Sequence, residues 1–214
     1  KARELGYEYI AITDHSKSLK IARGLDESRL KEQLELIDSI NQKVKDIRIL
    51  KGIEVDILPD GNLDLDDDIL KKLDVVIASI HSGFKQDQKS LTSRIVNACY
   101  NPYVKIIAHP TGRLIGRREP YNVDMDKVLE AAAQTGTVLE INSSPDRLDL
   151  NDLYSKRAVE MGIKIAINTD AHSSEALRDI MYGIWVARRG WLTADNVINT
   201  FSLEKLLKFL KVMK

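Results

Sequence analysis

Hydrophobic residues in this chain gather in short, nearly continuous runs that do not alternate with polar residues. The six runs are Tyr9–Thr13, Ile47–Ile57, Val75–Ile80, Val104–Ala108, Thr137–Ile141 and Ile163–Ile167. They are rich in isoleucine and valine, a pattern that is typical of parallel strands buried on both faces. Each run therefore predicts one strand of a parallel sheet.

Between the apolar runs, hydrophobic residues recur with the spacing of helices. The apolar face of the first predicted helix, in the segment 26–44, consists of Leu30, Leu34, Ile37 and Val44. The segment 124–136 has Asp124 at its start and Gly136 where a C-cap glycine belongs, and the segment 150–162 also ends in glycine. Further helices are expected near 174–189, near 193–200 and after residue 202.

This alternation of strands and helices predicts an α/β fold with a parallel sheet. The two possible architectures are a doubly wound open sheet and a closed or nearly closed barrel. The chain has no glycine-rich dinucleotide fingerprint and no phosphate-binding P-loop, which disfavours the open-sheet nucleotide binders. At the start, KARELG resembles the end of a helix, with Gly6 as its C-cap glycine. We therefore expect residues 1–214 to be a single domain that is cut inside its first strand–helix unit.

Composition narrows the function only slightly. The 214 residues are 43% hydrophobic and 30% charged, as expected for one compact domain. Lys+Arg and Asp+Glu both total 32, so the net charge does not indicate nucleic-acid binding and any basic surface must be local. The single cysteine, Cys99, excludes an internal disulfide and favours a cytoplasmic location. No apolar run approaches the ~18 residues of a membrane span, and no signal peptide is evident.

All four histidines follow predicted strands. His15 follows YIAITD, His81 follows VVIASI, His109 follows VKIIA and His172 follows KIAINTDA. The carboxyl ends of the strands form the rim where α/β proteins place their active sites. Any one histidine can be explained as a core or loop residue, but four at this rim indicate a shared purpose.

Carboxylates accompany these histidines. Asp14 precedes His15, Glu54 interrupts the apolar run LKGIEVDIL, and Asp170 and His172 would point to one side of an extended backbone. Imidazoles with carboxylates and no cysteine predict a site for Zn²⁺, Mn²⁺ or Fe, with two or more ions and Glu54 as a possible bridge. The alternatives are a solvent-facing Glu54 on an edge strand and an Asp14 that only orients His15.

The stretches ITDH, GIEVDI, SIHSGF, AHPTGR and NTDAH resemble the polymerase-and-histidinol-phosphatase (PHP) domain over essentially the whole chain. The form that follows bacterial and archaeal family X DNA polymerases is matched by SLKIARGLD, AHPTGRLIGRREPY, LEINSSPDRLDLND, INTDAHS and ARRGWLTADNVINT. The resemblance implies a distorted seven-stranded β/α barrel, of which this chain would hold six parallel strands. It also implies two to three ions of Mn²⁺ or Zn²⁺, with Fe possible, on the C-terminal rim.

Carried over by position, the resemblance assigns each candidate ligand. Glu54 would bridge two metals, and Asp170 would bind the first of them. His81 and His109 would complete the second metal, whereas His15 and His172 would bind the third. Glu54, His109 and Asp170 are the expected catalytic set. The family's first strand carries a His-x-His pair that is absent here, so the second metal position should be the most complete.

Basic residues near the strand exits are candidates for phosphate binding. They are Lys20, Arg23, Arg113, Arg117, Arg118 and Arg147. Arg113 and Arg147 are preferred because each closely follows a strand exit, and Asn142 and Ser143 could contact substrate. Cys99 is expected to be buried. Trp185 and Trp191 are expected to pack the last helices onto the barrel, and Thr193 to cap a helix.

The family resemblance implies a metal-dependent phosphoesterase that acts on DNA 3′ ends beside an upstream polymerase domain, with no membrane partner. A small-molecule phosphatase of the histidinol-phosphate type is the second possibility, because the same metals would serve it. A barrel that binds DNA or acts as a scaffold without catalysis is the third.

Overall fold

The structure is a computed structural model that describes residues 1–213, in which each predicted apolar run contains or overlaps one strand. The strands are β1 (Tyr9–Ile12), β2 (Arg48–Asp56), β3 (Val75–Ser79), β4 (Ile106–Ile107), β5 (Val138–Asn142) and β6 (Ile165–Asn168). Only two residues of the fourth run belong to a strand, although backbone bonds from Lys105 and Ala108 to β3 continue the pairing on both sides.

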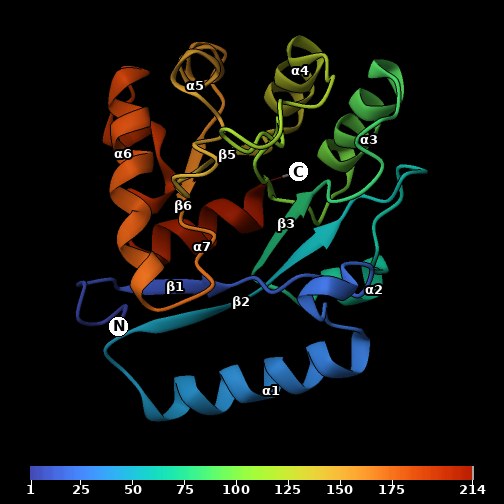
Figure 1. Ribbon diagram of the computed structural model, residues 1–214. Coiled ribbons are helices and arrows are strands. Elements are labelled where there is room, and N and C mark those ends of the chain that lie inside the picture. The colour runs from blue at the N-terminus through green and yellow to red at the C-terminus, as the bar shows by residue number, and fades with distance from the viewer. Residues whose placement is uncertain (214) are drawn as a thin grey trace.

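Each strand pairs in parallel with its neighbour in sequence, in the order β1-β2-β3-β4-β5-β6. The sheet curves into a half-barrel, with β1 and β2 along its lower side in Figure 1 and β5 and β6 above them. The predicted α/β fold with six parallel strands is therefore confirmed, and the barrel architecture is favoured over an open doubly wound sheet.

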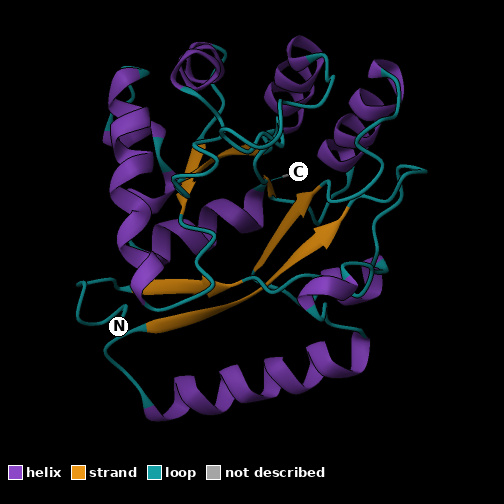
Figure 2. Ribbon diagram, in the orientation of Figure 1, coloured by secondary structure: helices purple, strands orange, loops and turns teal. Residues whose placement is uncertain are grey.

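The helices lie mainly outside the strands, as the colours in Figure 2 show. They are α1 (Glu27–Lys43), α2 (Asp67–Leu70), α3 (Gln88–Tyr100), α4 (Met125–Thr135), α5 (Asp152–Glu160), α6 (Ile180–Arg189) and α7 (Leu203–Val212). Short 3₁₀ turns η1 (Lys20–Ala22), η2 (Glu175–Asp179), η3 (Ala194–Asn196) and η4 (Ile198–Thr200) connect them. The helices predicted at 174–189 and 193–200 are thus partly or wholly 3₁₀.

Helix ends follow the local chemistry of the sequence. The Asp26 carboxylate accepts a bond of 2.9 Å from Arg29 N at the start of α1, and Asp124 caps α4 in the same way. Gly136 ends α4 with φ 71°, a left-handed conformation that glycine adopts without strain. Thr193 is the N-cap residue of a 3₁₀ turn, Ala194–Asn196, and its N donates to Asn196 Oδ1 at 2.8 Å. No helix among residues 1–213 has the length and apolar character needed to cross a membrane.

Residues 1–6 form hydrogen-bonded turns. Leu5 N donates to Lys1 O at 3.1 Å, and Gly6 has φ 80°. These are features of a helical C-terminus, although the segment has only turn geometry here. The expected upstream strand stays a prediction.

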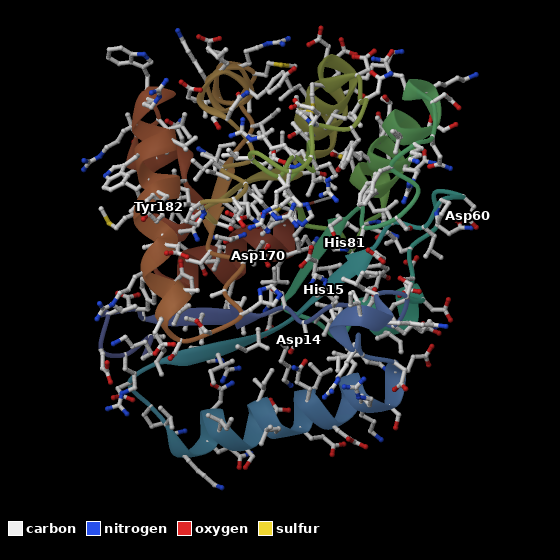
Figure 3. All side chains as sticks on the ribbon, in the orientation of Figure 1. Asp14, His15, Asp60, His81, Asp170 and Tyr182 are labelled. Atoms are coloured by element: carbon white, nitrogen blue, oxygen red, sulfur yellow. The ribbon has the colours of Figure 1, made fainter. Side chains whose placement is uncertain are left out.

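The carboxyl ends of the strands meet inside the curve of the sheet. His15 follows β1, His81 follows β3 and Asp170 follows β6. These three labelled residues lie near one another at the centre of Figure 3, whereas Asp60 and Tyr182 lie towards opposite sides. Parallel pairing therefore gathers residues that are far apart in the sequence, because all six strands end at the same rim.

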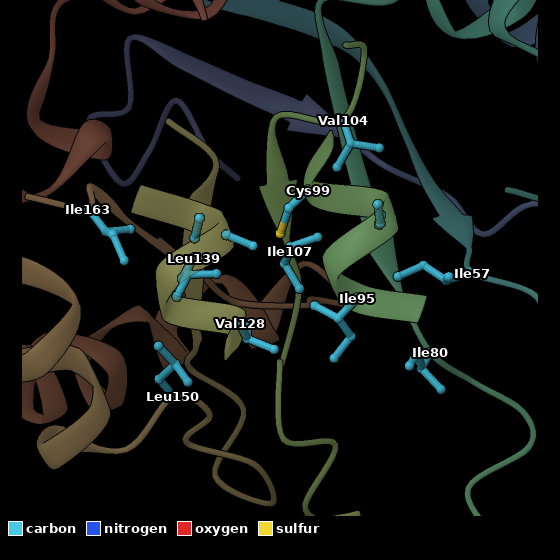
Figure 4. Packing of buried hydrophobic residues seen from close by; sticks show 14 of the residues in the cluster. Ile57, Ile80, Ile95, Cys99, Val104, Ile107, Val128, Leu139, Leu150 and Ile163 are labelled. Atoms are coloured by element: carbon cyan, nitrogen blue, oxygen red, sulfur yellow. The ribbon is translucent and has the colours of Figure 1, made fainter. Parts of the chain in front are cut away.

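Alternate strand residues enter two separate hydrophobic clusters. The outer cluster joins Ile53, Val55, Ile107 and Leu139 to the surrounding helices, and Figure 4 shows part of it around the fully buried Cys99. The inner cluster joins Leu50, Val75, Ile77, Ile106, Val138 and Ala166 to Leu206 and Leu210 of α7. Because side chains alternate along a strand, Glu54 and Glu140 fall on the same inner face as this second cluster.

Two large aromatic residues do not pack as expected. Trp185 is 51% exposed and Trp191 is 80% exposed, and Trp191 lies in a left-handed turn with φ 61°. Trp185 contacts Tyr182 of its own helix, with ring centroids 5.4 Å apart. The predicted packing of these tryptophans onto the barrel is therefore wrong, since hydrophobic size alone does not determine which face a side chain takes.

Candidate metal centre

The Glu54 carboxylate lies at the centre of three histidines. Its Oε1 atom is 3.1 Å from His109 Nε2 and 3.4 Å from His81 Nε2. Its Oε2 atom is 3.4 Å from His15 Nδ1. Glu54 is buried within β2, which lies between β1 and β3. The alternative of a solvent-facing glutamate on an edge strand is therefore excluded.

This arrangement keeps Glu54 ionised. Burial by itself would raise its pKa, but the hydrogen bond from His109 and the charges of His109, His81 and His15 together lower the pKa well below its usual range. Burial also lowers the pKa of His15, although the Glu54 charge opposes that shift. Carboxylates bind metal ions in their ionised form, and imidazoles bind them in their neutral form.

The donor atoms fit a divalent cation. One ligand atom each from His15, Glu54 and His81 lie within 4.8 Å of one another. His15 Nδ1 is buried without a hydrogen-bond partner even though it faces Glu54 Oε2. A cation between these atoms would satisfy both, and nitrogen and oxygen donors of this kind suit Zn²⁺, Mn²⁺ or Fe. The two oxygens of Glu54 face different histidines, with His81 and His109 beside Oε1 and His15 beside Oε2.

Asp170 and His172 lie at the edge of this group. β6 ends at Asn168, and Asp170 has φ 52°, so the extended backbone assumed for this pair is wrong. Instead, a turn brings His172 Nδ1 to 2.8 Å from Asp170 O and 3.8 Å from Asp170 Oδ1. The His172 side chain is 72% exposed, and its ring centroid lies 6.1 Å from that of His15.

A buried polar network that the sequence analysis missed supports Asp170 and His109. Glu140 of β5 accepts a bond of 2.8 Å from His109 N and another of 2.8 Å from Asn168 Nδ2. Asn142 Nδ2 donates to Glu140 Oε2 at 3.3 Å and to Asp170 Oδ2 at 3.1 Å. Asn142, expected to contact substrate, is fully buried and holds other site residues in place. An acidic residue inside the apolar run TVLEI was the signal for this network.

Burial raises the pKa of Glu140 to about 8, and the nearby charges of Asp170 and Glu54 act in the same direction. In the absence of cations, Glu140 therefore tends to keep its proton. Asp149, also missed, is fully buried and accepts bonds from Thr111 N at 3.0 Å and Gly112 N at 2.8 Å. It joins the loop after His109 to the loop after β5.

The predicted phosphate-binding arginines have different surroundings. Arg147 lies against the site, with Nε 3.5 Å from Asp170 Oδ2 and Nη1 buried without a hydrogen-bond partner. Arg113, by contrast, donates to the carbonyls of Arg147 and Leu148, which commits its guanidinium to the loop backbone. The preference for Arg113 as a phosphate ligand is therefore not supported.

The other basic candidates lie further out. Arg118 donates to Gly112 O and stacks over Phe84, with its guanidinium carbon 4.3 Å from the ring centroid. Arg117 is exposed and lies 3.6 Å from Asp146. Lys20 and Arg23 are also exposed, and Ser143 is fully buried.

Asp14 does not take the orienting role considered for it. Its carboxylate accepts a hydrogen bond from Gln33 of α1. The carboxylate that does contact a candidate histidine is Asp56, whose Oδ1 is 2.6 Å from His81 Nδ1. Asp56 was not among the predicted site residues, although it lies two residues after Glu54 in the same run.

Three comparisons relate this geometry to known proteins. No family model matches the chain. The chain is 52% identical over 206 residues to DNA polymerase/3′-5′ exonuclease PolX of Bacillus subtilis, a match that covers 96% of this chain and 36% of that protein. The chain thus spans about a third of the length of that relative.

Two further matches cover most of both partners. A protein described as a "probable phosphatase" of Thermoanaerobacter sp. strain X514 is 36% identical over 224 residues, covering 100% of this chain and 86% of that protein. The histidinol phosphate phosphatase of Lactococcus lactis, solved with zinc, L-histidinol and phosphate, superposes with a TM-score of 0.56. It is 15% identical and the match covers 88% of this chain and 84% of that one, so it shows the shared fold. The two sequence relatives and the half-barrel of this chain together establish that the chain belongs to the PHP (polymerase and histidinol phosphatase) family of metal-dependent phosphoesterases.

Proposed function

We propose that this domain is a metal-dependent phosphoesterase that removes nucleotides from DNA 3′ ends, as the PHP module of a family X DNA polymerase. The observation that carries the proposal is the ionised Glu54 carboxylate shared by His15, His81 and His109, in a chain 52% identical to a polymerase with 3′–5′ exonuclease activity. The upstream polymerase domain is part of the proposal, because the relative is much longer than this chain.

Each ligand has a distinct place in the proposed site. Glu54 would bridge two ions, with His81 and His109 beside Oε1 and His15 beside Oε2. Asp170 and His172 would complete the rim next to His15. Divalent cations bound here would lower the pKa of a water molecule and neutralise charge on the phosphate oxygens.

Arg147 is the residue of this chain best placed to hold the scissile phosphate. Its guanidinium lies beside Asp170, and one of its nitrogens is buried without a partner. A guanidinium can donate two parallel hydrogen bonds to phosphate oxygens. Contacts to phosphate carry little sequence information, so the enzyme would accept 3′ ends of varied sequence.

The test is digestion of an oligonucleotide labelled near its 5′ end, followed in Mn²⁺ with wild-type protein and with His109→Ala and Asp170→Ala. Stepwise shortening from the 3′ end, lost in both variants, would support the proposal. Unchanged digestion by both variants would refute the site. Arg117→Ala is a matched control, because this arginine is exposed and paired with Asp146.

A small-molecule phosphatase is the second candidate. The relative described as a "probable phosphatase" has 86% of its length covered by this chain, so this fold occurs without a polymerase region of comparable size. Histidinol phosphate and p-nitrophenyl phosphate should be assayed beside the oligonucleotide. Turnover confined to histidinol phosphate would favour this candidate. Metal binding without turnover of any of the three substrates would favour a non-catalytic DNA-binding or scaffolding module.

A further inference from the structure

Asp56 contacts the candidate metal centre from behind His81. It lies two residues after Glu54, is 4% exposed, and places Oδ1 2.6 Å from His81 Nδ1. On the other side of the imidazole ring, His81 Nε2 lies 3.4 Å from Glu54 Oε1. The His81 ring is therefore held between two carboxylates, of which only Glu54 belongs to the proposed ligand set.

This contact determines which nitrogen of His81 is free. A carboxylate can only accept a hydrogen bond, so a neutral His81 must carry its proton on Nδ1. Nε2, which lies 3.4 Å from Glu54 Oε1, then carries a lone pair and could act as a metal ligand together with that oxygen. His109 has no such support, because its Nδ1 is buried without a hydrogen-bond partner. The two histidines beside Oε1 are thus oriented by different means.

The second oxygen of Asp56 is also occupied. Oδ2 accepts a bond of 2.6 Å from Ser18 Oγ, and Asp56 N donates to Ser16 Oγ at 2.9 Å. Ser18 N in turn donates to Asp64 Oδ2 at 2.6 Å. These bonds fasten the segment after His15 to the end of β2. The same segment continues through η1 to the exposed Arg23.

We propose that Asp56 is a positioning residue of the metal centre. Oδ1 fixes the tautomer and orientation of His81 for metal binding, and Oδ2 anchors the 16–18 segment beside His15. Carboxylates that accept from a metal-binding histidine orient the ring and increase its basicity. The inference rests on the proposed function only in that both use the same cations, and it needs no particular substrate.

The first test is made on the wild-type protein and needs no metal. In metal-free wild-type protein labelled with ¹⁵N in histidine, the ring nitrogen shifts are measured at a pH well above the range in which imidazole is protonated. His81 should appear as the Nδ1–H tautomer, with His81→Asn used to assign its signals. Predominance of the Nε2–H tautomer would overturn the proposal.

The second test separates the two oxygens of Asp56. Zn²⁺ and Mn²⁺ affinities are measured by calorimetry for wild type, Asp56→Asn, Asp56→Ala and Ser18→Ala. Loss of the carboxylate should weaken binding roughly 10- to 100-fold. Ser18→Ala should weaken binding less than either Asp56 variant, because it removes the bond to Oδ2 but leaves the contact between Asp56 and His81 intact. Equal affinities in wild type and both Asp56 variants would overturn the proposal.

These readouts distinguish the positioning role from the proposed function. If DNA digestion fails but Asp56→Asn still weakens metal binding, the positioning role stands and the substrate proposal falls. If DNA is digested but both Asp56 variants keep wild-type metal affinity and wild-type His81 is the Nε2–H tautomer, the substrate proposal stands and the positioning role falls. Unfolding midpoints and ¹⁵N histidine spectra of the same Asp56 variants separate the roles, because a merely structural role would lower the midpoint without altering the tautomer.

Discussion

The inner face of the sheet has two ends of opposite character. At the amino ends of the strands, Leu50, Val75 and Val138 pack against Leu206 and Leu210 of α7. Further along two of these strands, β2 presents Glu54 and β5 presents Glu140 on the same face. Only a few residues along a strand separate a closed apolar layer from a cluster of buried ionisable groups.

The two ends contribute differently to folding. Burial of apolar side chains at the α7 end stabilises the fold without requiring partners of particular geometry. Buried carboxylates at the rim cost free energy unless hydrogen bonds or cations compensate for the loss of water. Here Glu140 accepts bonds from His109 N and Asn168 Nδ2, and Glu54 faces three histidines. The comparison indicates that the α7 end maintains the fold while the rim is specialised for binding cations.

The largest expected effect is the loss of activity in Glu54→Gln. An amide is neutral and cannot bridge cations as a carboxylate does, so phosphoesterase activity should fall roughly a thousand-fold, or by ~4 kcal/mol of transition-state stabilisation. Steady-state rates in Mn²⁺ measure this, with circular dichroism as the check on folding. Full activity in a folded Glu54→Gln variant would contradict the assignment of cation binding to the rim.

Leu206→Ala should instead lower the stability of the fold and leave metal binding at the rim unchanged. This side chain is 5% exposed and lies in the inner cluster, so truncation should cost about 2–5 kcal/mol of unfolding free energy. Urea denaturation measures the loss. Val212→Ala is the control on the same helix, because Val212 is 75% exposed and its truncation should stay within about 0.5 kcal/mol. A large fall in metal affinity of folded Leu206→Ala would show that the ends are coupled.

Cations should stabilise the domain through the rim alone. Ligands that bind only the folded state add about 2.7 kcal/mol at a free concentration of roughly 100 times their dissociation constant. Thermal unfolding with and without Zn²⁺ or Mn²⁺ should show this gain in wild type and in Leu206→Ala. The gain should be lost when chelator is added and should be much smaller in Glu54→Gln.

Arg147→Ala should give the smallest of these changes. Loss of charge-assisted hydrogen bonds to a phosphate, worth about 1.5–3 kcal/mol, predicts roughly a 10- to 100-fold fall in kcat/KM. Arg147→Lys should restore only part of it, since an ammonium lacks the bidentate geometry. Metal affinity should change little. If Arg147→Ala matched Arg117→Ala in its kinetics, phosphate binding by Arg147 would be excluded.

Much of the fold could be predicted because buried strands and helix caps are local signals. The six apolar runs correspond to β1–β6, and Asp26, Asp124 and Gly136 lie at helix ends. The rim position of the histidines followed from the same pattern, since each follows the end of a run by one to five residues. The conformation of Asp170 could not be predicted in this way, because φ 52° depends on the turn that follows β6 and on contacts from Asn142 and Arg147.

The prediction of arginine roles shows the same limit. Arg113 and Arg147 each closely follow a strand exit, and the sequence offers no way to separate them. In the structure the Arg113 guanidinium binds the carbonyls of residues 147 and 148, whereas Arg147 reaches Asp170. Which arginine side chain is free to bind a substrate therefore depends on backbone acceptors contributed by another loop.

The sequence by itself determined the order of strands and helices, the rim on which the four histidines gather, and the family. These features depend on residue type and short-range spacing. Because consecutive strands pair in parallel, the order along the sequence directly gives their positions in the sheet. Only the tertiary structure decided that Glu54 lies between three histidines, that Asp56 supports His81, and that Trp185 and Trp191 face outward. Those contacts join residues many positions apart, and their geometry is set by the curvature of the sheet and the packing around it.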